Sequence, residues 1–259
     1  MVALAPARAG RPGASRPVAD ELESCPFCAG REDRTPPETL RLGDPWQVRV
    51  VPNLYPAVER QEVVVHTPEH LRSLDELGDD QLELVAEAWR LRAAAAREAG
   101  FVYVQALVNE EREAGSSLPH THSQLAWFRQ VPPVPAAERP SVALLDGDVV
   151  LERDGLVLLC PPASRLAYEL LVVPATAEEN AFESGLLGSA LQLAAEGIRR
   201  LHRIRPAAPL NLWLHDVAWW HIELVPRLSV LAGLELGAGI YVNTLDPAEA
   251  ARQLREAVT

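Results

Sequence analysis

Apolar and polar positions along this chain follow one pattern twice. In the first pass, short apolar runs near residues 47–52 and 61–66 predict two strands. A helix is predicted from Asp79 to Arg97, because this segment is rich in Ala and Leu and contains neither Gly nor Pro. Two further apolar stretches, at about 101–108 and 121–128, predict the strands that end this pass.

The second pass has the same order of elements. Strands are predicted at 155–160 and 168–174, then a helix from about 177 to 203. Strands near 210–215 and 219–225 complete it. Residue identity between the two passes is low, so the internal duplication is inferred from the order of elements alone.

Pro and Gly residues mark the boundaries between these segments. Residues 1–45 are rich in Pro, Gly and Arg and are expected to form loops and turns. A proline-rich link at 131–135 separates an N-terminal half, residues 1–135, from a C-terminal half, residues 136–259. A helix from about Pro247 to Ala257 closes the chain. The expected fold is α+β, with two duplicated halves, a mixed or antiparallel sheet and flanking helices.

Composition and charge exclude several classes of protein. At 259 residues, with 48% hydrophobic and 23% charged residues, the chain has the composition of a globular protein with a sizeable core. The net charge of −12 argues against a nucleic-acid-binding surface, although a small phosphorylated ligand needs only local arginines and backbone N–H groups. The apolar runs are too short to span a membrane, and the first residues lack the apolar core of a secretory signal. We therefore expect a cytoplasmic protein without a membrane partner.

The segment Gly115-Ser-Ser-Leu-Pro-His120-Thr-His122-Ser-Gln124 carries the candidate chemistry. If this segment is extended, side chains two residues apart point the same way, so His120, His122 and Gln124 share one face. That arrangement suits a histidine nucleophile that attacks phosphorus, next to a neighbour that binds a metal or holds the backbone. The alternative is a surface strand with two exposed histidines.

Cys25 and Cys28 form a CxxC pair, and three cysteines in a chain of this length do not make a disulfide framework. The pair is interpreted as two buried thiols, as a redox site, or as half of a metal knuckle. A redox site needs a strand before the pair and a helix after it, which the turn-like flanks do not offer. A closed tetrahedral zinc site needs two more ligands, and His70 and His120 are the natural candidates.

With His120 on a metal, His122 is left to act as the nucleophile. Attack on phosphorus requires a neutral ring with one nitrogen free and the other held as N–H by an acceptor such as a backbone carbonyl. Gln124 could donate its amide N–H to a phosphate oxygen, and Gly115, Ser116 and Ser117 could present backbone N–H groups to the same phosphate.

Several short motifs, in their order along the chain, resemble one known family. They are Ala5-Pro-Ala-Arg8-Ala-Gly-Arg11-Pro12, Cys25-Pro-Phe-Cys28, Val51-Pro-Asn53-Leu-Tyr-Pro56, Thr67-Pro-Glu-His70, the segment through His120, His122 and Gln124, Trp220-His-Ile-Glu-Leu-Val-Pro-Arg227, and Gly233-Leu-Glu235 through Asn243. Together they are similar to the galactose-1-phosphate uridylyltransferase family, a branch of the histidine-triad superfamily, over nearly the whole chain. The resemblance implies that both halves are histidine-triad-like.

The resemblance also assigns roles to individual residues. His122 matches the nucleophile that forms a covalent nucleotidyl-histidine intermediate, and Gln124 matches the residue that stabilises it. Cys25, Cys28, His70 and His120 match structural zinc ligands. The matching substrate contacts are the nucleoside-binding positions Asn53, Leu54 and Tyr55, the phosphate-binding positions Asn109, Ser116 and Ser117, and the paired arginines Arg8 and Arg11. The family often forms dimers, which is consistent with a homodimer, but the sequence leaves the oligomeric state open.

The chain departs from the family pattern in three places. Thr121 stands where the family usually has proline between the two histidines. The family's second metal site draws on a His-x-His pair, and Trp219 replaces the first of these histidines before His221. The second site is therefore expected to lack a ligand, with His221 a core or pocket residue and His215 at the surface. Glu235 matches a sugar-contacting glutamate, but its neighbours differ.

The sequence therefore predicts a nucleotidyltransferase of the UDP-glucose–hexose-1-phosphate uridylyltransferase type, working by double displacement through His122. Its expected partners are a nucleotide sugar and a sugar phosphate or phosphate acceptor. With inorganic phosphate as acceptor it becomes a phosphorylase of a nucleotide sugar, such as ADP-glucose, or of a dinucleotide; with water it becomes a hydrolase. The remaining alternative is a zinc-stabilised nucleotide-binding protein without turnover. The base, the sugar and the acceptor are left open.

Overall fold

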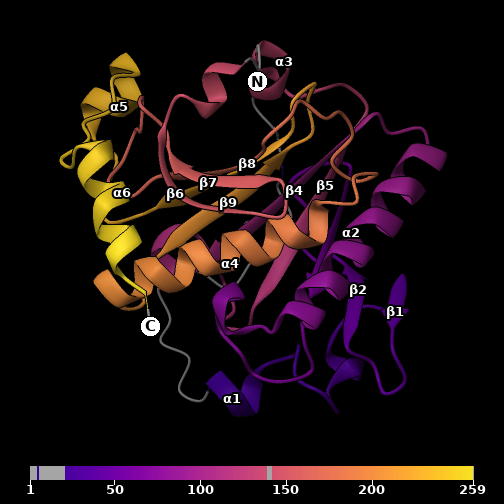
Figure 1. Cartoon of the computed structure of the whole chain (residues 1–259). Coiled ribbons are helices and arrows are strands. Elements are labelled where there is room, and N and C mark those ends of the chain that lie inside the picture. The colour runs from indigo at the N-terminus through magenta and orange to yellow at the C-terminus, as the bar shows by residue number, and fades with distance from the viewer. Residues whose placement is uncertain (1–4, 6–20, 139–141, 259) are drawn as a thin grey trace.

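A single ten-stranded sheet runs through the protein in the computed structural model, which describes residue 5 and residues 21–138 and 142–258 (Figure 1). All nine pairs of neighbouring strands are antiparallel. The strands, in chain order, are β1 (Leu40–Leu42), β2 (Val48–Pro52), β3 (Arg60–Val65), β4 (Tyr103–Glu110), β5 (His122–Phe128), β6 (Asp148–Arg153), β7 (Leu156–Cys160), β8 (Leu170–Pro174), β9 (Leu210–His215) and β10 (His221–Pro226).

The sheet joins two five-strand units with the same internal order. Its spatial order is β1-β2-β3-β5-β4-β9-β10-β8-β7-β6, so the C-terminal strands repeat the N-terminal order in the opposite sense. The units meet where β4 pairs with β9 and Leu107 lies opposite Trp213. This pairing makes one continuous sheet and brings the ends of β4 and β9 together.

Two long helices cover one face of the sheet. α2 (Asp79–Glu98) and α4 (Leu187–Ile204) pack against each other and against the strands of both units (Figure 1). The shorter helices are α1 (Glu21–Ser24), α3 (Pro133–Ala137), α5 (Gly233–Ala238) and α6 (Pro247–Glu256), with 3-10 turns η2 (Glu32–Arg34), η3 (Leu74–Glu76), η4 (Arg112–Ala114) and η5 (Val142–Leu145). In the described ranges, no helix combines the length and the hydrophobicity needed to cross a bilayer.

The alternation of side chains along the strands divides the core between the two faces. Val64 and Leu125 belong to the large cluster under the helices, whereas Val63 and Val65 pack with Cys25 and Phe27 on the other face. On β5, Ser123 accepts a hydrogen bond from the indole of Trp89 on α2 at 2.8 Å. The neighbouring residues His122 and Gln124 therefore project from the face opposite the long helices.

The α+β class, the duplicated order of elements and the antiparallel sheet with flanking helices confirm the expectation from the sequence. The strand β6 was not predicted, and two details of the prediction were wrong. β1 lies within residues 1–45, which were expected to be loops and turns, because it pairs with β2. The helix expected from residue 177 begins only at Leu187, because Asn180 has a φ of 59° and the Ala181 N–H donates to Asp216 at 2.8 Å. These interactions hold the intervening residues in turns.

Candidate active site and metal centres

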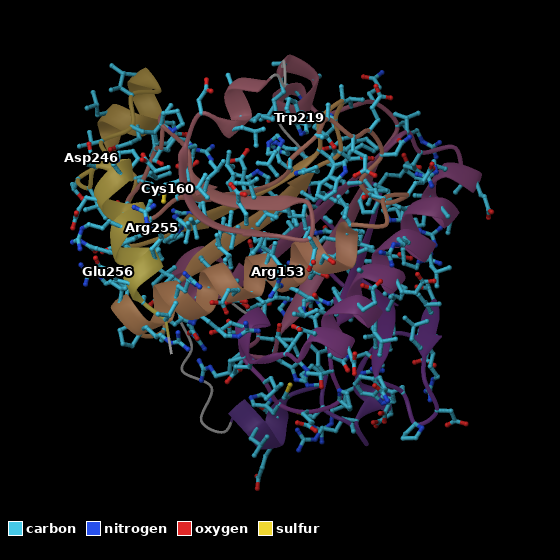
Figure 2. All side chains as sticks on the ribbon, viewed as in Figure 1. Arg153, Cys160, Trp219, Asp246, Arg255 and Glu256 are labelled. Carbon is cyan, nitrogen blue, oxygen red and sulfur yellow. The ribbon has the colours of Figure 1, made fainter. Side chains whose placement is uncertain are left out.

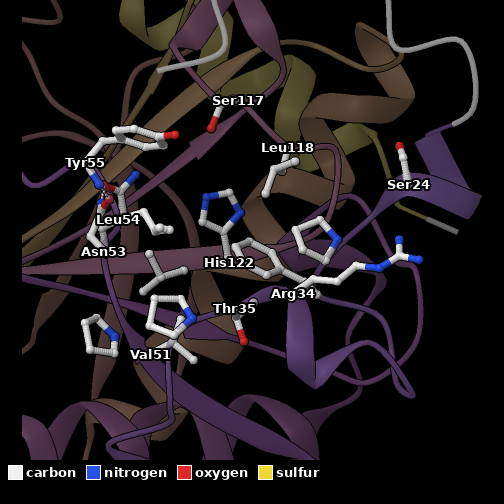
Figure 3. Close-up of a pocket in the computed structure, with 16 residues that line it drawn as sticks. Ser24, Arg34, Thr35, Val51, Asn53, Leu54, Tyr55, Ser117, Leu118 and His122 are labelled. Atoms are coloured by element: carbon white, nitrogen blue, oxygen red, sulfur yellow. Dashed lines mark hydrogen bonds between the residues drawn. The ribbon is translucent and has the colours of Figure 1, made fainter. Parts of the chain in front are cut away.

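A cavity of about 340 Å³ opens on the face of the sheet opposite α2 and α4. Figure 3 shows His122 at its centre, with Tyr55 and Asn53 on one side and Arg34 and Ser24 on the other. Most of its wall is apolar, formed by Pro26, Phe27, Pro36, Val51, Pro52, Leu54, Val63 and Leu118. Such a wall, with few polar groups, suits a ligand that has an apolar ring and a polar tail.

His122 is the first residue of β5 and is held by its own backbone. Its Nδ1 lies 2.7 Å from the carbonyl oxygen of His120, and its side chain lines the cavity although the residue is only 7% exposed. Because a carbonyl oxygen only accepts, Nδ1 carries the proton and donates. The lone pair is then on Nε2. This is the tautomer that nucleophilic attack requires.

The amide of Gln124 is oriented by two neighbours. Its Oε1 accepts hydrogen bonds from Gln61 at 2.6 Å and from Asn53 at 3.4 Å. Since these bonds engage the carbonyl end of the amide, the NH₂ end turns the other way. Gln124 lines the cavity beside His122, where an N–H donor can meet a phosphate oxygen.

A tight loop leads from β4 to the His-Thr-His segment. Gly115 has a φ of +92°, and the Ser116 N–H donates to the carbonyl of Glu111 at 3.1 Å. The Ser116 hydroxyl donates to the carbonyl of Leu118 at 2.9 Å, while Ser117 lines the cavity. The loop therefore carries its backbone to the edge of the cavity, and only glycine adopts the conformation at 115 without strain.

The structure brings some of the predicted site residues together and separates others. Asn53, Leu54, Tyr55, Ser117, His122 and Gln124 all line one cavity. Asn109 instead accepts a hydrogen bond from Asn211 at 2.7 Å, where β4 meets β9. Glu235 lies on α5, outside the residues that line the cavity. Arg8 and Arg11 lie outside the described residues.

Sequence reasoning missed two residues of this site. The Phe27 ring meets the His122 ring edge-on, with centroids 5.4 Å apart, and so limits its rotation. Its place inside the CxxC pair was the available signal. Gln61 was hidden in an apolar strand, and only its pairing opposite β5 reveals its contact with Gln124.

Cys25, Cys28, His70 and His120 converge on one point and could hold a metal ion. Their facing S···N separations are 3.5 Å for Cys25–His120, 3.3 Å for Cys28–His70 and 3.8 Å for Cys28–His120. Tetrahedral zinc with ordinary bond lengths gives S···N edges of about 3.6 Å, so these donors fit it. The other His120 nitrogen donates to the Thr67 carbonyl at 2.9 Å, which leaves Nδ1 for a metal. Burial raises the pKa of the Cys28 thiol to about 11, so a bound cation must displace its proton.

A second cluster that could hold a metal lies in the C-terminal unit, made by Glu138, His215, His221 and Glu223. The separation of donor atoms is 3.3 Å for His215–Glu223, 3.7 Å for His221–Glu223 and 3.9 Å for His221–Glu138, whereas His215 and Glu138 are in direct contact at 2.5 Å. Tetrahedral N/O coordination gives edges of about 3.4 Å. Trp219 replaces the first histidine of the His-x-His pair, but Glu223 and Glu138 provide oxygen donors that this pattern does not include, so four side chains still converge here. Occupancy of this site by a metal stays a prediction. His215, expected at the surface, is only 4% exposed.

The electrostatics of the second cluster favour an ionised Glu223. Burial opposes ionisation of Glu223, but its hydrogen bond with His221 and the charge of Arg165 outweigh burial and lower its pKa to about 2. The guanidinium of Arg165 also pairs with Glu169 at 2.6 Å. The spacing of His221 and Glu223 repeats that of His122 and Gln124, each pair at the start of its strand. This repeat was the sequence signal for Glu223.

The buried carboxyl of Glu110, at the end of β4, should make the free energy of unfolding depend on pH. Burial raises its pKa to about 7, although Ser73 and the Leu74 N–H donate to its carboxylate. The folded protein therefore binds a proton that the unfolded chain has lost between about pH 4.5 and pH 7, and stability falls as pH rises through this window. The shift corresponds to at most about 3 kcal/mol.

The Glu110→Gln variant should lose most of this pH dependence. Urea unfolding at pH 5 and pH 8 measures it, with Glu113→Gln, an exposed glutamate in the turn that follows β4, as the matched control. Equal pH dependence in wild type and Glu110→Gln would contradict the assignment.

The chain is similar to known enzymes over almost its whole length. Residues 56–133 match the family described as galactose-1-phosphate uridyl transferase, N-terminal domain. The chain is 27% identical to ADP-glucose phosphorylase from Arabidopsis thaliana, covering 98% of this chain and 89% of that protein. It is 25% identical to galactose-1-phosphate uridylyltransferase from Thermotoga maritima, covering 93% and 92%. The crystal structure of an Arabidopsis thaliana ADP-glucose phosphorylase with bound ADP-glucose has the same fold, with a TM-score of 0.83, 23% identity and coverage of 95% and 93%.

Proposed function

Because the chain is similar to galactose-1-phosphate uridylyltransferases and to ADP-glucose phosphorylase over almost its whole length, we propose that it is a nucleotidyltransferase that works by double displacement through His122. The observation that carries the proposal is the orientation of this histidine. Nδ1 donates to the His120 carbonyl, so the unprotonated Nε2 lies in the cavity. A nucleotide sugar is the donor substrate.

In the first step, Nε2 of His122 attacks the α-phosphorus of the nucleotide sugar. A P–N bond forms, the P–O bond to the β-phosphate breaks, and sugar 1-phosphate leaves with the bonding electron pair. In the second step, a phosphate oxygen of the acceptor attacks the same phosphorus and Nε2 departs. The leaving phosphate is a weak base, so no strong general acid is needed. Catalysis rests on orientation and on charge stabilisation by Gln124 and the loop at Gly115–Ser117.

The apolar part of the cavity fits the nucleoside. Phe27, Val51 and Val63 offer a surface for the base, and Asn53 and Tyr55 supply polar groups beside His122. Arg8 and Arg11 remain proposed phosphate contacts on the resemblance alone. Two acceptors are consistent with this site. A hexose 1-phosphate makes the protein a uridylyltransferase, and inorganic phosphate makes it a phosphorylase, the activity named for the Arabidopsis relative.

Zinc is the proposed metal of the Cys25, Cys28, His70 and His120 centre. Two thiolates with two imidazoles make the closed donor set of structural zinc sites. Zinc bound there would supply rigidity, because all four tetrahedral positions are filled by side chains. It would tie together the turn at the cysteines, the segment after β3, and the residue two before the nucleophile.

A homodimer is part of the proposal. Several large apolar side chains in and around α5 are exposed to solvent. Val230 is 89% and Leu236 is 75% exposed. Glu235 lies in the same segment, and α5 and β1 lie at opposite ends of the molecule in Figure 1. We place this segment against a second copy, where Glu235 contacts the sugar in the partner's cavity. Sedimentation equilibrium should give a dimer that Leu236→Asp dissociates; a monomeric wild type would exclude it.

One experiment tests the function. The protein is incubated with UDP-glucose, with ADP-glucose and with dinucleotides, without acceptor, and its intact mass is measured. An adduct of the mass of UMP or AMP names the base, and peptide mapping should place it on His122. Hexose 1-phosphates or inorganic phosphate are then added to the adduct, and the compound that removes it is the acceptor. If no nucleotide leaves an adduct and none is turned over, the proposal fails.

A further inference from the structure

The peptide between His120 and Thr121 is held at both of its ends. Its carbonyl oxygen accepts the Nδ1–H of His122 at 2.7 Å, and its N–H donates to the Leu71 carbonyl at 2.7 Å. The two bonds lie on opposite edges of one amide plane. Hydrogen bonds linked through an amide polarise one another, so the bond to Leu71 makes the carbonyl a better acceptor for His122. The orientation of the nucleophile thus depends on this plane.

Thr121 has two further anchors, both from His66. The His66 N–H donates to the Thr121 carbonyl at 3.3 Å, and His66 Nδ1 lies 3.0 Å from the Thr121 hydroxyl. Both residues are buried, His66 being 0% and Thr121 2% exposed. Proline at position 121 would have no N–H for Leu71 and no hydroxyl for His66, and would fix the backbone through its ring instead. Threonine leaves the backbone torsion φ at position 121 free to rotate, so hydrogen bonds must fix it.

We infer that His66 and Thr121 form a positioning pair, which holds the His120–Thr121 peptide so that His122 keeps its proton on Nδ1 and presents Nε2 to the substrate. The pair does not touch the substrate and acts through this peptide. The inference rests on the proposed function for its effect on rate, and on geometry alone for its effect on the tautomer of His122.

A histidine at position 66 lowers the stability of the fold if its only role is to fill the core. Its Nε2 is buried, and among the described residues it has no hydrogen-bond partner. An unsatisfied buried polar atom lowers stability, so an apolar ring of similar size should be tolerated or even stabilising there. A positioning role predicts the opposite pattern for the rate, which the same substitution should lower.

Four variants separate the two roles. Thr121→Val keeps the shape and the backbone N–H but removes the hydroxyl, and Thr121→Ser is its matched control because it keeps the hydroxyl. His66→Phe removes the partner of that hydroxyl, and His66→Phe combined with Thr121→Val removes the polar pair together. The rate constant of adduct formation on His122 is measured by rapid quench and intact mass. The nucleotide Kd, the metal content and the Tm are measured on the same samples.

Thr121→Val and His66→Phe should each lower the adduct rate constant by about tenfold, with the Kd within about twofold of wild type and the metal content unchanged. The double variant should be no slower than the slower single variant, because both remove one unit. Thr121→Ser should stay close to wild type. Single-variant rate constants within about twofold of wild type would overturn the inference, as would losses that only follow the metal content.

The tautomer gives a readout that does not depend on turnover. Long-range ¹H–¹⁵N NMR spectra of the imidazole rings should show His122 as the Nδ1–H form in wild type and as a mixture in Thr121→Val. Identical spectra in the two proteins would overturn the inference even if no substrate were found. Failure of the proposed function would give a different result, because the wild-type protein would then form no adduct with any nucleotide.

Discussion

Replacing His122 with asparagine is expected to abolish the nucleotidyl adduct and to lower kcat by at least about 10⁴-fold, since removal of a covalent nucleophile leaves only orientation and charge stabilisation. Asparagine can keep a hydrogen bond to the His120 carbonyl but has no nucleophilic nitrogen. Nucleotide affinity should change little, because the apolar wall that contacts the base is untouched. Steady-state kinetics with the best donor and acceptor, and equilibrium binding of the nucleotide, measure the two effects.

Gln124→Ala serves as the graded comparison for this variant. Its loss should be about 10²–10³-fold, the usual cost of removing one donor to a developing charge, and the adduct should still form slowly. Asn53 and Gln61 lose their shared acceptor in Gln124→Ala, so part of its loss should appear as weaker nucleotide binding. A His122→Asn protein with substantial turnover, or an adduct mapped to His221, would contradict the assignment of the nucleophile.

The sequence points to the N-terminal cluster more directly than to the C-terminal one for a physical reason. Cys25 and Cys28 lie three residues apart and His120 lies two residues from His122, so local spacing already places proposed metal ligands near each other and near the proposed nucleophile. The C-terminal cluster draws on Glu138, which follows α3 in the link between the halves. Nothing in the local pattern distinguishes that glutamate from a solvated one, and only the fold brings it to His215.

Side-chain networks were equally hidden from the sequence. Gln61 reads as part of an apolar strand, and His66 as the residue at its end. Their roles depend on the register between β3 and β5, in which Val65 lies opposite His122. The order of elements follows from hydrophobic periodicity, whereas the register follows from long-range pairing. Order could therefore be predicted, and contacts across the sheet could not.

Replacing Cys25 with serine is expected to remove one equivalent of metal and to destabilise both the fold and the site. The thiolate is one of four donors, and serine does not replace it as a zinc ligand. Loss of a structural metal should cost on the order of 3–5 kcal/mol here, less than in isolated zinc fingers, because the large core under α2 and α4 remains. Phe27 packs against both His120 and His122, so kcat should fall as well.

Cys160→Ala is the matched control, since it also removes a buried thiol. Cys160 ends β7 in the C-terminal unit and lies near Arg255 of α6 in Figure 2. It is not one of the four converging donors. It should lose some stability through its cavity but no metal. His215→Ala completes the set: a second equivalent should disappear if the C-terminal cluster binds a cation.

Metal analysis of the purified proteins, with thermal unfolding of each, gives the answer. Wild-type metal content in Cys25→Ser would contradict the ligand assignment. Stability equal to that of Cys160→Ala would show that the metal, where bound, does not hold the cysteine turn to the His-Thr-His segment. Loss of metal and stability together in Cys25→Ser, with the second equivalent kept, would mean that the two centres fill independently and that the N-terminal one braces the nucleophile.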